Sequence, residues 1–140
     1  EHGRNITDEQ IKACAATGGV VCVSGVSWFL GSAHPSAGDL ARHAAYVADL
    51  AGVEHVGIGT DISFHQAGLD DRPPGEFDPG YWWPKSAGYD RALNDAAYVP
   101  VGVWGELRAA LARAGLPDSA VAGIMGGNME RVARQVWSPQ

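Results

Sequence analysis

Only two stretches of this chain have the pattern of a buried β-strand, and no other feature limits its possible folds more. Residues 20–23, Val-Val-Cys-Val, form a continuous run that is typical of a strand covered on both faces in a parallel sheet. Residues 55–59, His-Val-Gly-Ile-Gly, predict a second buried strand, which delivers Asp61 at its C-terminal end. A sheet of two parallel strands leaves both edges open and cannot cover several apolar helix faces. The sequence therefore predicts one part of a larger α/β body.

Amphipathic helices alternate with these strands. Thr7 and Gln10 form a capping box in front of a helix predicted over residues 8–17, and a second helix is predicted over residues 39–51. Further helices are predicted around Val103 to Leu111, ended by Gly115, from Pro117-Asp118 onward, and after Gly126-Gly127-Asn128, which we interpret as punctuation between helices. This order is that of βα units, although a complete eight-stranded βα barrel needs about 250 residues.

The helical and strand periodicity disappears between residues 62 and 100. This long segment contains Tyr81, Trp82, Trp83 and Tyr89. Loops of such length are usually functional or disordered, and the tryptophans favour a packed lid over a tether. The aromatic side chains could close over a substrate, or they could pack against the scaffold or a partner subunit.

Composition and charge exclude several classes of function. With 46% hydrophobic and 19% charged residues, the chain has the composition of a soluble globular domain. Its net charge of -6 offers no positive surface to nucleic-acid phosphates, so we expect no nucleic-acid partner. No apolar run approaches the roughly 18 residues of a membrane span, and residues 1–4 resemble neither a signal peptide nor a natural start. Cys14 and Cys22 lack metal-type spacing, so we expect buried, reduced thiols and a cytoplasmic location.

Four sequence blocks follow one another along the chain. They are residues 4–10 (RNITDEQ), 18–23 (GGVVCV), 52–61 (GVEHVGIGTD) and 126–132 (GGNMERV). Each block is weak evidence by itself, but four blocks in this order with sensible gaps are specific. Together they resemble the membrane dipeptidase family, the zinc dipeptidases typified by renal dipeptidase.

The resemblance implies a (β/α)8 barrel of the amidohydrolase kind that hydrolyses dipeptides with two zinc ions at the C-terminal rim of its strands. Residues 1–140 would be the C-terminal portion of that one barrel domain. In the family, the zinc ligands are a His-x-Asp pair, a bridging Glu and two later histidines, all upstream of the first block. The partners implied are a dipeptide substrate and the N-terminal portion of the barrel, on the same chain or a separate one, with a homodimer also open. We assign no metal to the five histidines present: His2, His34, His43, His55 and His65.

Two residues match functional positions of the family. Asp61, after the final barrel strand, matches the acidic residue that faces the water or hydroxide bridging the metals, and a carboxylate there can accept a proton and deliver it to the departing amine. Arg4 matches the residue that binds the C-terminal carboxylate of the substrate, which a guanidinium pairs with in two-pronged geometry. Ser63, where many relatives have a second acidic residue, and Val26, near a common aromatic position, depart from the family pattern and leave side-chain specificity open.

Two other functions remain alternatives. Without the resemblance, an aspartate after a glycine-rich strand is most often a helix cap or turn residue, and an arginine near a chain end is a surface charge. A non-catalytic half-barrel that binds or assembles, having lost the metal centre, is therefore the second hypothesis. A different amidohydrolase-type barrel enzyme with a related chain ending is the third.

Overall fold

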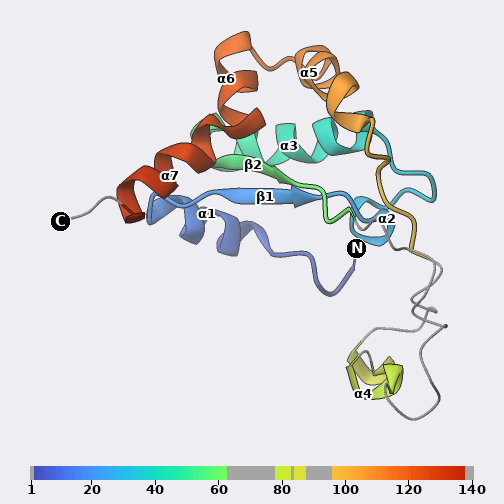
Figure 1. The fold of residues 1–140 in the computed structure, drawn as a ribbon. Coiled ribbons are helices and arrows are strands. Elements are labelled where there is room, and N and C mark those ends of the chain that lie inside the picture. Colours follow the sequence, from blue (N-terminus) through green and yellow to red (C-terminus); the bar gives the residue numbers. More distant parts are fainter. Residues whose placement is uncertain (1, 63–77, 83, 88–95, 138–140) are drawn as a thin grey trace.

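Two parallel strands and the helix that joins them form the centre of the chain (Figure 1). The computed structural model describes residues 2–62, 78–82, 84–87 and 96–137. Strands β1 (Val21–Ser24) and β2 (Val56–Gly59) pair in register from Val21 opposite Val56 to Ser24 opposite Gly59. Helix α3 (Ala37–Ala51) connects them. The predicted strand–helix–strand unit is thereby confirmed, with each strand beginning one residue later than expected.

The remaining elements surround this unit. They are the helices α1 (Asp8–Ala16), α2 (Ser27–Leu30), α4 (Pro79–Trp82), α5 (Val103–Arg113), α6 (Asp118–Ala122) and α7 (Asn128–Trp137), the 3-10 turns Val53–His55 and Lys85–Ala87, and a π-helical turn at Gly123–Gly127. In Figure 1, α3, α5 and α6 lie on one side of the sheet and α1 lies on the other. No helix of the described ranges is long and apolar enough to cross a membrane.

Local signals explain where the helices begin and end. The Thr7 hydroxyl accepts a hydrogen bond from the backbone N–H of Gln10, whose side chain bonds back to Thr7, so the predicted capping box at α1 is confirmed. Gly18 follows with φ of 80°, the left-handed conformation expected at this stop. A second capping box joins Ser36 and Asp39, and it starts α3 two residues earlier than predicted.

The hydrophobic core lies between the sheet and the α3–α5 layer. Leu40 and Ala44 of α3 are fully buried, as are Leu107 and Leu111 of α5. Val56 of β2 is also fully buried and belongs to the same cluster. Burying each such side chain contributes about 1.5–3 kcal/mol to stability, so this face of the sheet holds the unit together.

The opposite face of the sheet is largely uncovered. Cys22 is exposed, Ser24 is half-buried and Gly59 is exposed, because side chains alternate along a strand and the described helices pack mainly on the other face. The expectation that both faces of β1 are covered and that Cys22 is buried is therefore wrong. Both cysteines are free thiols; Cys14 is half-buried, and the Cys22 thiol lies 3.7 Å from the sulfur of Met129.

The first residues of α7 bind the chain where both strands begin. The Asn128 side chain is buried and donates hydrogen bonds of 2.8 Å to the carbonyls of Val53 and Val56. The Arg131 guanidinium donates to the carbonyls of Gly18 and Glu54, at 3.0 and 3.1 Å. These four bonds tie the C-terminal helix to segments that lie more than 70 residues earlier in the sequence.

Replacing Asn128 with alanine should lower the free energy of unfolding by about 1–3 kcal/mol, because it leaves two backbone carbonyls without their donor. Urea unfolding of the full-length protein measures this change. Val136→Ala, which truncates an exposed side chain on the same helix, should change stability by less than about 0.5 kcal/mol. Equal effects of the two substitutions would contradict the anchoring role of Asn128.

The Asp39 capping box should make stability depend on pH. Burial alone would raise the pKa of the Asp39 carboxyl, but hydrogen bonds from Ser36 and Arg42 outweigh it and lower the pKa below its ordinary 3.8. A lowered pKa stabilises the fold above the unfolded-state value, and this contribution is lost as pH falls through the folded-state value. Wild type should therefore exceed Asp39→Asn in unfolding free energy near neutral pH, and the gap should shrink below about pH 3.8. Asp49→Asn, on an exposed position of α3, is the matched control for the substitution itself.

Candidate active site

The carboxyl ends of β1 and β2 meet at one edge of the sheet, and there the chain comes unusually close to itself. The Gly25 N–H donates to the carbonyl of Thr60 at 3.1 Å, and the Gly25 carbonyl accepts from the N–H of Val99 at 3.0 Å. A Cβ at position 25 would collide with the Thr60 carbonyl and the Val99 side chain. Only glycine lets these three segments join, so Gly25 helps to place the residues that follow both strands.

Asp61 lies at this edge, two residues after β2. Its φ is 57°, and it is the one non-glycine residue with a positive φ in the part of the chain that the structure describes. Aspartate tolerates this left-handed conformation better than most residues, and such conformations cluster at functional sites. The side chain is exposed, which is compatible with contact to a substrate or to another part of the protein.

Arg4 lies beside helix α2, the turn of helix that follows β1. The Arg4 backbone N–H donates to the His2 Nδ1 at 3.2 Å. The guanidinium carbon of Arg4 lies 5.3 Å from the centre of the Phe29 ring, and the Asn5 amide donates to the Phe29 carbonyl at 3.0 Å. The segment before α1 is thus attached to the carboxyl end of β1 through Phe29.

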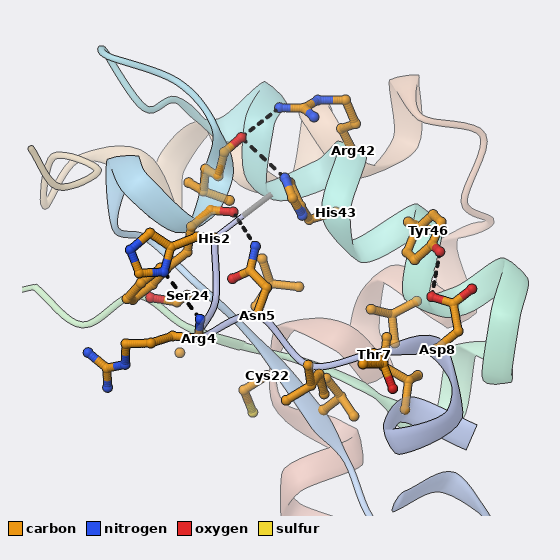
Figure 2. A pocket seen from close by; sticks show the side chains of 18 of the residues that line it. His2, Arg4, Asn5, Thr7, Asp8, Cys22, Ser24, Arg42, His43 and Tyr46 are labelled. Atoms are coloured by element: carbon orange, nitrogen blue, oxygen red, sulfur yellow. Dashed lines mark hydrogen bonds between the residues drawn. The ribbon is translucent and has the colours of Figure 1, made fainter. Parts of the chain in front are cut away.

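Asp61 and Arg4 line one open trough. The trough has a volume of about 1490 Å³ and runs along β1 between the N-terminal segment and α3. In Figure 2, His2, Arg4 and Ser24 lie toward one end, while Tyr46 and Asp8 lie toward the other, joined by a hydrogen bond of 2.6 Å. Both site residues predicted from the sequence therefore line the same trough.

Other polar groups of the trough serve the fold. Arg42 donates to the Leu30 carbonyl at 3.2 Å and to Asp39 at 2.9 Å. The His43 Nε2 lies 3.3 Å from the same Leu30 carbonyl. These contacts tie α2 to α3, so the charge of Arg42 is already engaged by Asp39.

The histidines are dispersed. His2 stacks against Trp28 with ring centres 6.3 Å apart, and the His55 Nδ1 lies 2.8 Å from the Gly19 carbonyl, where the strands begin. His34 is exposed, and His65 is outside the described residues. Within residues 2–62, 78–82, 84–87 and 96–137, no three His, Cys, Asp or Glu residues are grouped as a metal site.

Several features of the long segment and of the family departures fall outside the described part. Ser63, Trp83, Tyr89 and the side chain of Trp82 belong there, so the aromatic lid stays a prediction. Tyr81, on α4, is 74% exposed. Val26, the other departure, is buried, and its backbone forms an antiparallel bridge with Tyr98.

Sequence reasoning missed Phe29 as part of this site. The only signal was an aromatic pair, Trp28-Phe29, shortly after the first strand. Aromatic residues at that distance from a strand are common in cores, so the pair did not stand out. Its contact with Arg4 joins positions 25 residues apart and emerges only from the fold.

The fold and the sequence of the chain are similar to those of known hydrolases. A solved amidohydrolase from Pseudomonas aeruginosa superposes with a TM-score of 0.71 and 32% identity, over 99% of this chain and 42% of that one. The chain therefore has an α/β fold of the amidohydrolase kind.

The family model named Membrane dipeptidase (Peptidase family M19) matches residues 1–73, which include both Arg4 and Asp61. The chain belongs to this family. Dipeptidase verJ of Clonostachys rogersoniana is 35% identical over 74 residues, which are 51% of this chain and 19% of that protein. Dipeptidase ataJ of Aspergillus terreus is 29% identical over 136 residues, 95% of this chain and 27% of that protein. The chain spans about a fifth to a quarter of the length of these curated relatives.

Proposed function

We propose that the protein is a zinc-dependent dipeptidase in which this chain supplies Asp61 as the acid and base and Arg4 as the binder of the substrate carboxylate. The observation that carries the proposal is that both residues line one trough beside the carboxyl ends of β1 and β2. In α/β barrels, active sites form at this end of the strands. Both residues also fall within the part of the chain that the family model matches.

The complete body, in this proposal, is a (β/α)8 barrel of which residues 1–140 are the C-terminal portion. Two features support it. The described sheet has two strands and an exposed face around Cys22, which further strands could cover. In addition, the related amidohydrolase chain is more than twice as long as the part that this chain matches. The N-terminal portion would then be the main partner of this chain.

The zinc ions, in this proposal, would be held mainly by residues outside this chain; within the described ranges no three His, Cys, Asp or Glu residues are grouped as a metal site. When bound, two zinc ions lower the pKa of the attacking water and polarise the scissile carbonyl.

Asp61 would move the proton. Peptide hydrolysis takes a proton from the attacking water and must give one to the departing amine. A carboxylate within hydrogen-bond reach of both can do each in turn. The exposed side chain of Asp61, projecting from a left-handed turn at the strand end, is accessible for this role.

Arg4 would favour substrates that have a free C-terminal carboxylate. A guanidinium presents paired N–H donors that match the two oxygens of a carboxylate. Both residues line the same trough, so a peptide whose C-terminal carboxylate pairs with Arg4 would have its last peptide bond in the trough that Asp61 also lines. A peptide with an amidated C-terminus would lack this interaction.

Replacing Asp61 with asparagine should lower kcat about 10²- to 10⁴-fold, because the amide cannot accept and return a proton. Zinc content should stay at about two ions per active site. The measurements are dipeptide hydrolysis and metal analysis of the full-length protein, with Asp49→Asn as the matched control. Full activity of Asp61→Asn would remove this residue from the mechanism. A wild-type protein that binds no metal and cleaves no dipeptide would favour the non-catalytic half-barrel instead.

Replacing Arg4 with alanine should raise KM for dipeptides about ten- to hundredfold, as expected from losing hydrogen bonds between charged groups worth about 1.5–3 kcal/mol. The same dipeptide with a C-terminal amide should be a poor substrate for both proteins. For this amide, Arg4→Ala should raise KM little above the wild-type value. Arg108→Ala, an exposed arginine on α5, is the control. An equal loss for acid and amide substrates would contradict carboxylate binding by Arg4.

A further inference from the structure

Phe29 is contacted by three neighbouring residues of the N-terminal segment. The His2 ring meets it edge-on with centres 5.0 Å apart and planes at 68°. The Arg4 guanidinium carbon lies 5.3 Å from its ring centre, and the Asn5 amide donates to its carbonyl at 3.0 Å. This one residue therefore holds the segment by its ring and by its backbone.

The backbone of Phe29 is itself well anchored. Its N–H and that of Leu30 donate to the Val26 carbonyl, both at 3.1 Å, which forms the turn of α2. Ser27 is buried and exchanges two bonds with Ala97: its N–H donates to the Ala97 carbonyl at 2.8 Å, and its hydroxyl accepts from the Ala97 N–H at 3.0 Å. The far end of α2 is held by the contacts of Arg42 and His43 with the Leu30 carbonyl. Hydrogen bonds at both ends of the short helix α2 thus fix the backbone that carries the Phe29 ring.

Because helix α2 is held in place, the Phe29 ring can attract and order the Arg4 guanidinium. A cation within about 6 Å of an aromatic ring centre is attracted by the negative face of the ring. An arginine side chain is flexible and loses conformational entropy when it binds a ligand. A guanidinium that is already held in place loses less entropy on binding. A rigid ring beside an exposed Arg4 can therefore prepare the guanidinium before a ligand arrives.

We propose that Phe29 is a positioning residue for substrate recognition: its ring holds the Arg4 guanidinium at the carboxyl end of β1, ready to pair with the free carboxylate of a dipeptide. The inference rests on the proposed function, in which Arg4 binds that carboxylate. It adds that the strength of recognition depends on the aromatic ring of Phe29 and not merely on its bulk.

Removing the ring should weaken recognition and leave the chemistry intact. In the full-length protein, Phe29→Leu should raise KM for dipeptides about two- to fivefold with kcat unchanged, which is the effect expected of an exposed cation–π contact. Phe29→Tyr keeps a ring of the same kind and should leave KM within about twofold of wild type. Trp104→Leu, which removes a partly exposed aromatic side chain from α5, is the control and should leave KM unchanged.

A double-mutant cycle with Arg4→Ala separates positioning from general packing. If Phe29 acts through Arg4, Phe29→Leu should not raise KM further once Arg4 is alanine. A further two- to fivefold rise in that background would overturn the proposal. An unchanged KM in Phe29→Leu, beside a raised KM in Arg4→Ala, would also overturn it while leaving the proposed function in place.

Two other outcomes are decisive. If Arg4→Ala itself leaves KM unchanged, the proposed function of Arg4 fails and the positioning role fails with it. If Phe29→Leu does not fold, the tyrosine variant decides: a folded Phe29→Tyr whose KM is raised fivefold or more would overturn a role that depends on the ring.

Discussion

The parallel pairing of β1 and β2 is the constraint on which the rest of the structure depends. Because both strands run the same way, the segments that follow them emerge at one end of the sheet, and Asp61 there lines the same trough as Arg4. At the opposite edge, Asn128 and Arg131 bind the carbonyls that precede the strands. Contacts that hold the fold are thus found at one end of the two strands, and the proposed catalytic residue Asp61 follows the other end, where α/β barrels form their active sites.

Local sequence signals predicted the secondary structure well. Capping residues and glycine stops, such as Thr7 and Gly18, act over three or four residues, and the helix they delimit ended within one residue of its expected place. Asp61 could be singled out because the residue after a buried strand lies at an edge of the sheet whatever the rest of the fold does. The start of α3 was missed by two residues because Ser36 was not recognised as its cap.

Features that depend on distant segments could not be predicted. The burial of Cys22 was inferred from an apolar run, but burial is decided by what packs on each face, and the described helices cover mainly the other one. The hydrogen bonds from the Asn128 side chain to the carbonyls of Val53 and Val56 join positions more than 70 residues apart. The place of Phe29 beneath Arg4 likewise depends on a four-residue helix, α2, too short to show any periodicity.

Among the described residues, β1 pairs with β2 along one edge and with no strand along the other, which has a practical consequence for handling the molecule. A strand whose N–H and C=O groups face outward will accept another strand, whether the intended neighbour or an unrelated one. β1 consists of a Val-Cys-Val-Ser run that contains no charge or proline to discourage such pairing. In concentrated solution the protein should accordingly tend to aggregate through this strand unless another segment pairs with it.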